Sequence, residues 1–398
     1  MSERCRQPAL CLRLAAFFPA LWGRVFCGLL TLMSVGVADA SPAPIQTQFS
    51  DTQVLVSLPN LASPALAPSQ TEDQLATKVR DFLQQARSEG DPRYLGYAQR
   101  ALERWPETQM TDRLRVLRAT LWQSLHRFDE ARADLAQVLA TGNVNANTIQ
   151  ATLTLANLEL VQGHYEAARR ACGQLQQHYP GLLALNCQAQ VSARTGQALE
   201  AYDSLTAAKD NASRLSATDR SWTEGTLGDL AAQLGRPEAE LHWRRTLRIA
   251  PDDLYVRAQL ADWLINQQRF EETLALTEGY EAVDSLAVLR AIALNRAGHD
   301  HADDLTMRLR ERFAEARWRG NLLHQRDYAR FLLDVEGEVS DALTFARQNW
   351  QAQREPMDTR LLLRAARAND DNDLLRVTRQ WLAQANQQDA RFSEDTRP

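Results

Sequence analysis

From Thr71 onward, apolar side chains recur at the 3.6-residue period of an α-helix in nearly every segment of the chain. In the first of these segments, Thr71 and Gln74 have the spacing of a capping box, and the helical pattern extends to about Ser88. The segments that follow are short, about 12–15 residues each, and brief turns separate them. No convincing pair of strands appears. The hydrophobic pattern therefore predicts an all-α fold.

Prolines and small residues recur at related intervals along this helical region. Four prolines each close a predicted helix, and their spacings of 74, 71 and 105 residues equal two, two and three units of about 35 residues. Small residues also occur in pairs whose members lie eleven or twelve residues apart. The prolines are Pro106, Pro180, Pro251 and Pro356, and the pairs are Ala119 with Ala131, Ala156 with Ala168, Ala189 with Ala201, Gly228 with Ala239, and Ala291 with Ala302.

This spacing has a physical explanation in the packing of helical hairpins. A small residue on each of two antiparallel helices lets their axes approach to about 8–10 Å. Phe128, Tyr165 and Phe270 stand three positions before the second small position and would cover the open end of a pair. Proline ends the second helix because it cannot continue the hydrogen-bond ladder. One hairpin cannot bury its apolar face alone, so the pairs must stack on each other.

Four segments resemble tetratricopeptide repeats, and Leu227-Gly228 matches the Leu-Gly pair of that family's first helix. The resemblance implies an α-solenoid of about nine helix pairs that forms a right-handed superhelix with a concave inner surface. The segments are LHRFDEARADLAQVL (125–139), QGHYEAARRACGQLQQHYP (162–180), LGRPEAELHWRRTLRIAPDD (234–253) and NQQRFEETLALTE (266–278).

The chain departs from the family pattern at a few positions. Thr273 replaces the usual small residue, Arg330 stands where alanine or glycine is expected, and the seventh unit has a lengthened second helix. These departures affect individual boundaries and not the array. The expected units are approximately 71–107, 111–144, 148–181, 182–215, 220–252, 253–283, 284–320, 321–357 and 358–390.

The first forty residues have the pattern of a secretory signal peptide. Residues 1–24 carry four arginines and one acid, an apolar run from Val25 to Val37 follows, and Ala38-Asp39-Ala40 ends the segment. The run is shorter than the roughly 20 residues that a membrane-spanning helix needs. We expect cleavage after Ala40, with an uncleaved signal anchor as the alternative. No small residues precede Cys27 as in a lipobox, so we expect a soluble periplasmic protein without a membrane span or lipid anchor.

The remaining parts of the chain differ in composition from the helical array. Residues 41–70 hold five prolines with serine and alanine and show no helical period, which predicts a disordered linker. The superhelical domain is expected over 71–390, with a polar terminal cap at 369–388. Residues 391–398 are expected to form a loose C-terminal tail.

Two cysteines remain once the leader is removed. Cys172 falls in the second helix of the third unit and Cys187 in the first helix of the fourth, and the tetratricopeptide resemblance implies that these helices are neighbours. An even pair in an oxidising compartment is a candidate disulfide. The alternative is that each cysteine is a separate, small, buried side chain.

Composition and motifs favour binding over catalysis. The formal net charge of −5 excludes the general basic field expected of a nucleic-acid-binding protein. The chain has no P-loop, G-x-S-x-G, G-x-G-x-x-G or H-E-x-x-H motif, and we expect no cofactor and no enzymatic activity.

One cluster of possible metal ligands occurs, in Gly298 to Asp304. His299, His301 and Asp303 could bind a divalent cation. The segment is also a predicted turn, where carboxylates at a helix N-terminus complement the helix dipole. We favour the turn and predict no metal site, while a metal-binding or enzymatic protein using this cluster remains an alternative.

The predicted function is a non-enzymatic scaffold or adaptor of the bacterial cell envelope that binds a protein along its concave face. An extended polysaccharide, held by exposed tryptophans, is an alternative ligand. Seven arginines between Arg308 and Arg330 could meet an acidic partner or form a solvated helix face. The candidate partner-binding residues are Asn157, Gln190, Asp262, Asn266, Arg317 and Arg319.

Overall fold

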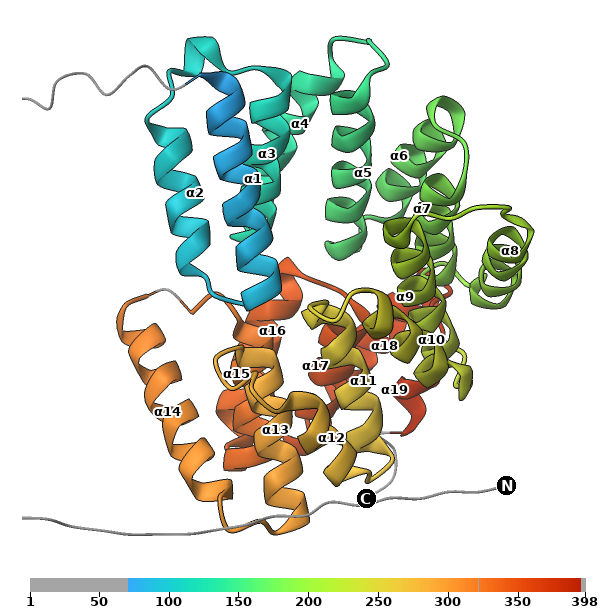
Figure 1. Ribbon diagram of the computed structural model, residues 1–398. Helices are drawn as coiled ribbons and strands as arrows, with labels where there is room; N and C mark the ends of the chain where they lie inside the picture. The colour runs from blue at the N-terminus through green and yellow to red at the C-terminus, as the bar shows by residue number, and fades with distance from the viewer. Residues whose placement is uncertain (1–70, 321, 395–398) are drawn as a thin grey trace, which may run out of the picture. The chain divides into compact units, whose positions relative to one another are not determined.

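The computed structural model describes residues 71–320 and 322–394, and every regular element in these ranges is helical (Figure 1). The predictions for the leader (1–40) and the linker (41–70) lie outside the described residues. Helices α1 to α18 form nine consecutive pairs, and α19 follows them. The helices are α1 (Glu72–Glu89), α2 (Arg93–Glu103), α3 (Asp112–Ser124), α4 (Phe128–Leu139), α5 (Ala146–Val161), α6 (Tyr165–His178), α7 (Leu182–Ala193), α8 (Ala198–Asn211), α9 (Ala217–Gln233), α10 (Glu238–Ile249), α11 (Leu254–Asn266), α12 (Phe270–Thr277), α13 (Asp284–Ala297), α14 (Ala302–Trp318), α15 (Gln325–Phe331), α16 (Val339–Ala352), α17 (Pro356–Ala368), α18 (Asn372–Gln384) and α19 (Arg391–Glu394).

The nine pairs coincide with the nine expected units, so the predicted all-α solenoid is confirmed. The hydroxyl of Thr71 accepts from the backbone of Gln74 and the Gln74 side chain accepts from the backbone of Thr71, which is the expected capping box. Helix α14 has 17 residues, in agreement with the predicted lengthening. Pro356 differs from the other prolines, because it is the first residue of α17, where its missing N–H costs nothing.

The small residues act where the two helices of a pair cross. In the fifth pair, a Cβ atom at position 228 would lie 2.5 Å from Cδ1 and Nε1 of Trp243. Trp243 of α10 is 1% exposed, and its indole N–H donates to Asp229 of α9 over 3.1 Å. Glycine at 228 is therefore what lets the Trp243 indole lie against the backbone of α9.

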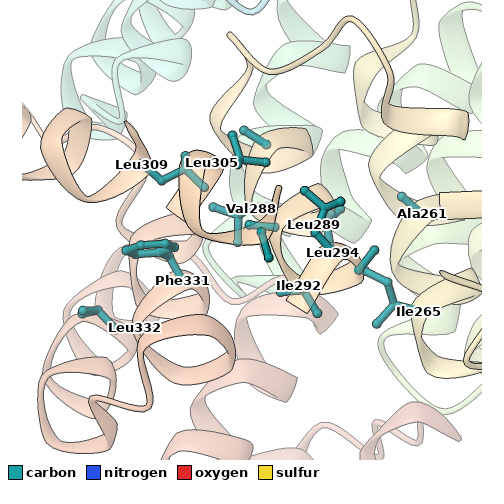
Figure 2. Packing of buried hydrophobic residues seen from close by; sticks show 14 of the residues in the cluster. Ala261, Ile265, Val288, Leu289, Ile292, Leu294, Leu305, Leu309, Phe331 and Leu332 are labelled. Carbon is teal, nitrogen blue, oxygen red and sulfur yellow. The ribbon is translucent and has the colours of Figure 1, made fainter. Parts of the chain in front are cut away.

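Apolar side chains from consecutive pairs form cores that continue from one pair to the next. Figure 2 shows one of them, in which Val288, Leu289 and Ile292 of α13 lie among residues of neighbouring helices. Helix α13 has buried residues on all its faces, as expected for a helix that is covered by its partner and by both adjacent pairs. The neighbouring residues in the cluster include Ala261 and Ile265 of α11, Leu305 and Leu309 of α14, and Phe331 of α15.

The eighth pair departs most from regular geometry. A π-helical segment, Leu332–Glu336, continues α15. Arg330 occupies the position where a small residue is usual, and its guanidinium lies 2.6 Å from Asp262 of α11 and 2.5 Å from Asp334 of the π-helical segment. The charge is thus paired on both sides, which permits an arginine at a buried position.

The last pair also contacts pairs far away in sequence. The hydroxyl of Tyr165 in α6 donates to Gln387 over 3.0 Å, although 222 residues separate them. Gln233 of α9 donates to the carbonyl of Gln388 and accepts from the N–H of Ala390. A stack in which each unit touches only its neighbours would lack these bonds.

The expectation of a loose tail from residue 391 is wrong for its first residues. Residues Arg391–Glu394 form helix α19, and Arg391 is buried with its guanidinium 2.6 Å from the Asp389 carboxylate. This pair satisfies the charge that burial would otherwise penalise. Across 71–320 and 322–394, no helix combines the length and the hydropathy that crossing a bilayer requires.

Candidate functional site

The first helices of the early pairs line a polar pocket of about 480 Å³, which we call the amide pocket. Two predicted partner-binding residues, Asn157 of α5 and Gln190 of α7, lie in its wall together with Gln123 of α3. These three positions are 34 and 33 residues apart, so the repeat itself brings them to the same face. The other polar residues of its wall are Thr120, Ser124, Gln150, Thr154, Trp222 and Arg87.

The three repeated amides are free to bind another molecule. Within the described residues, the side chains of Gln123, Asn157 and Gln190 form no hydrogen bond, whereas Gln150 donates to Thr154 over 3.3 Å. Each free amide offers donors and an acceptor together. This is the complement of a peptide backbone, which presents one donor and one acceptor per residue.

The pocket is almost uncharged. Arg87 at the end of α1 is the only ionisable residue in its wall, and burial lowers the pKa of Arg87 from its usual value. A partner would therefore be recognised here by hydrogen bonds and contact area, because the wall offers no field to attract a polyanion.

A disulfide forms part of the wall. Cys172 of α6 and Cys187 of α7 are joined in the structure, with their Cα atoms 5.5 Å apart. The bond links the third pair covalently to the fourth in the wall of the amide pocket. Both residues are buried, at 1% and 6% exposed, so the bond also holds two core positions together.

The predicted residues Asp262 and Asn266 lie outside the amide pocket, and both are hydrogen-bonded to other residues of the array. Asp262 is 3% exposed and accepts from Arg330 over 2.6 Å and from Arg360 of α17 over 2.9 Å. Asn266 accepts from the same Arg360 guanidinium over 2.9 Å and donates to Asp262. The side chains of Arg330 from α15 and Arg360 from α17 thus reach α11, where Asp262 is buried and Asn266 stays exposed. The Asp262 carboxylate is thus already paired with two guanidinium groups inside the protein.

The two predicted arginines lie at the end of α14 and do not join the amide pocket. Arg317 donates to the hydroxyl of Tyr328 over 3.0 Å and stacks over the Tyr328 and Phe345 rings. Arg319 pairs with Glu315 one turn earlier in the chain. Trp318 beside them is 86% exposed, so this end of α14 presents an accessible aromatic surface.

The three candidate metal ligands do not converge. The His299 imidazole lies 2.9 Å from Glu271 and the His301 imidazole 3.9 Å from Asp304, while Asp303 is exposed in the first turn of α14. Over 71–320 and 322–394, no three histidine, cysteine or acidic residues are grouped so that they could hold a metal ion.

Sequence reasoning missed Gln123, Gln150, Trp222 and Arg87. The repeat spacing from Asn157 would have found Gln123, because the two occupy the same register in adjacent units. Trp222 was considered only as one of several tryptophans that could pack between helices or bind carbohydrate, and no sequence signal pointed to Arg87. Their positions depend on how α1 and α9 are placed around α5, which is a property of the assembled array.

The chain was compared with family models, curated proteins and solved structures. No family model matches the chain, and no curated protein matches it. Among solved structures, the TPR domain of P58(IPK) is similar over 76% of this chain and 89% of that one, with 15% sequence identity and a TM-score of 0.21. The nine helix pairs and the close approach at Gly228 are features of this chain's own structure.

Proposed function

We propose that this protein is a non-enzymatic scaffold that binds an extended segment of a partner protein in the amide pocket. The observation that carries the proposal is the row of free amides at Gln123, Asn157 and Gln190, which the repeat places on successive first helices. An extended chain crossing these helices would meet a donor and acceptor on each unit. Trp222 at the end of the row supplies apolar contact area for a side chain.

The test compares two triple variants of the full-length protein. We expect Gln123→Ala/Asn157→Ala/Gln190→Ala to bind its partner about a hundredfold more weakly, because each hydrogen bond contributes roughly 1 kcal/mol. The partner is first captured by crosslinking in the native envelope from a photoreactive residue placed at Thr120, and its affinity is then measured with purified components. The control, Gln84→Ala/Gln177→Ala/Gln348→Ala, changes three exposed amides on α1, α6 and α16 and should bind like the wild type. Equal affinity of the two variants would contradict the proposal.

A carbohydrate polymer is a second candidate ligand for the same pocket. Trp222 is half-buried beside the amides, and sugar hydroxyls could use the amide groups in the way a peptide would. A glycan array followed by titration of Trp fluorescence distinguishes the two ligands. Quenching that is lost in Trp222→Phe, without any captured protein, would favour the carbohydrate.

We also propose that the protein acts in the periplasm after export. The signal-like pattern of residues 1–40 and the Cys172–Cys187 disulfide both support this compartment, because stable disulfides belong to oxidising environments. Cell fractionation with N-terminal sequencing tests it. A cytoplasmic protein that retains Met1 would contradict export, and a membrane-bound protein that retains residues 1–40 would indicate an anchor.

A further inference from the structure

A second pocket, of about 320 Å³, lies where the first pair meets the sixth to ninth pairs. Its wall comes from α1, α2, α11, α13, α15 and α17, so residues from the beginning and the end of the array share it. We call it the closure pocket. Arg87 also borders the amide pocket, while the remaining charged residues of the closure pocket belong to it alone.

Much of the closure pocket is apolar. A volume near 300 Å³ is at the lower end of the range for small-molecule sites and suits a ligand of one or two amino-acid residues in size. Apolar surface would favour a ligand with an aliphatic body by about 25 cal/mol for each Å² removed from water. The apolar residues include Leu95, Ala258, Val288, Leu289, Leu323 and Leu361.

Most charged groups around the pocket are already paired. Asp262 pairs with Arg330, the His324 imidazole lies 3.3 Å from Asp284, and Arg326 lies 3.1 Å from Glu355. These pairs leave the wall electrically balanced. A ligand would gain little by competing with them, because breaking a buried pair costs more than a new contact returns.

Two side chains of opposite charge are exceptions. Among the described residues, neither Arg87 nor Asp327 forms an ion pair or a side-chain hydrogen bond. Arg87 lines the pocket and is exposed, and its partial burial lowers its pKa. Burial raises the pKa of Asp327, and the nearby Arg326 and His324 only partly offset this effect. Since neither group is in an ion pair with a residue of the described array, both can contact a ligand group of opposite charge.

We propose that the closure pocket binds a small zwitterion with an aliphatic body, of the class of free amino acids and dipeptides. Arg87 would hold its carboxylate through paired N–H donors, and Asp327 would accept from its ammonium group. The apolar wall between them would cover its side chains. This ligand differs from the protein partner of the amide pocket, and binding it would also stabilise the contact between the first pair and the later pairs.

The test measures binding to the full-length protein by calorimetry with three probes. Leucylleucine carries both charges, N-acetyl-leucylleucine only the carboxylate, and leucylleucine amide only the ammonium. We expect wild type to bind leucylleucine at least about tenfold more tightly than either blocked form, since each charged hydrogen-bonded contact is lost with its group. This comparison uses unaltered protein, so it does not depend on how a variant folds.

Variants then assign each charge. Arg87→Gln should lower the affinity for leucylleucine about tenfold or more and leave the affinity for leucylleucine amide unchanged. Asp327→Asn should lower the affinity for leucylleucine by a similar factor and leave the affinity for N-acetyl-leucylleucine unchanged. The matched controls Arg80→Gln and Asp303→Asn change exposed residues outside the pocket and should bind like the wild type. The proposal is overturned if leucylleucine does not bind at millimolar concentration, if the blocked forms bind equally well, or if neither variant changes its affinity.

Discussion

At the residue scale, the positions that break the repeat pattern have the most specific partners. Arg330 replaces a small residue, and it is accommodated because Asp262 and Asp334 lie on either side of it. Asp262 in turn lies between Arg330 and Arg360, from two other pairs of the array. Apolar contacts recur in every unit of the array and so do not distinguish one unit from another. The buried ion pairs of Asp262 occur at one place only, and they connect the sixth pair specifically to the eighth and ninth pairs.

Asp262 makes the stability of the protein sensitive to acid. Burial alone would raise its pKa, but Arg330 and Arg360 outweigh that effect and lower the pKa to about 2. The unfolded pKa is about 3.9, so the ionised carboxylate stabilises the fold above about pH 4 and this contribution is lost as the pH falls toward 2. We expect the loss to be about 2–3 kcal/mol in urea unfolding followed from about pH 5 downward.

The variant Asp262→Asn isolates this contribution. At neutral pH it should unfold about 3–5 kcal/mol more easily, because it leaves buried arginines short of a counter-charge, and its stability should fall less steeply with acid. Asp303→Asn, at an exposed position, should keep both the stability and the pH slope of the wild type. A slope in Asp262→Asn equal to that of the wild type would show that other carboxylates control the acid response.

Glycine at 228 gives a second residue-scale prediction. Gly228→Ala places a methyl group 2.5 Å from the Trp243 ring and should destabilise the protein by about 1–3 kcal/mol. Gly173→Ala is the matched control, because it is also in a helix but its methyl group would meet no atom within 4 Å. The control should be stabilising by about 0.5–1 kcal/mol, since alanine favours the helix. Chemical denaturation of both variants measures the difference, and equal effects would refute close packing at this crossing.

At the scale of the elements, each helix is stabilised mainly by its neighbours in sequence. Helix α13 contacts its partner α14 and the adjacent α11, α12 and α15, and buries residues on every face. Short helices of this kind are marginal alone, so their stability comes from stacking. The disulfide between α6 and α7 adds a covalent link to one of these stacked interfaces.

Removing this link should weaken the array at one place. The Cys172–Cys187 bond closes a ring with a sequence separation of 15, for which the chain-entropy model gives about 3 kcal/mol. We expect Cys172→Ala/Cys187→Ala to lose about this much in urea unfolding, and added reductant to lower the stability of wild type without affecting the variant. Two reactive thiols in the unreduced, exported protein would contradict the bond.

At the scale of the whole described array, contacts between distant pairs are as specific as those within a pair. Residues after α18 bond to α6 and α9, and the backbone N–H of Arg354 donates to the carbonyl of Val161 over 2.7 Å. The Trp381 ring of α18 also lies 6.0 Å from the Tyr165 ring. The ninth pair thus contacts the third pair directly, and the residues that follow α18 contact the third and fifth pairs.

Deleting residues 386–398 tests this support. In a stack with only nearest-neighbour contacts, faster hydrogen exchange would be confined to α17 and α18. Because Gln387 and Gln388 bond to Tyr165 and Gln233, we expect faster exchange in α6 and α9 as well, measured by mass spectrometry. Deletion of 395–398 alone is the control. Unchanged exchange in α6 and α9 after the longer deletion would contradict the role of these contacts.

The amino-acid sequence alone determined that the array is helical and that its helices form successive pairs. These features depend on interactions within about 35 residues, and such interactions leave a period that can be read directly. The same period placed Asn157 and Gln190 on one face. It predicted the crossing at Gly228 for the same reason.

Only the tertiary structure decided which faces remain free. Asp262 and Asn157 were both predicted to contact a partner, yet Asp262 is buried and paired with Arg330 and Arg360, while Asn157 is exposed and its side chain forms no hydrogen bond among the described residues. The pairing of Asp262 with Arg360 joins residues 98 positions apart, and the closure pocket gathers residues from the first pair and the last. Contacts between residues so far apart in sequence depend on the small rotation between each helix pair and the next. These rotations add up over many pairs, and no local sequence pattern shows the total.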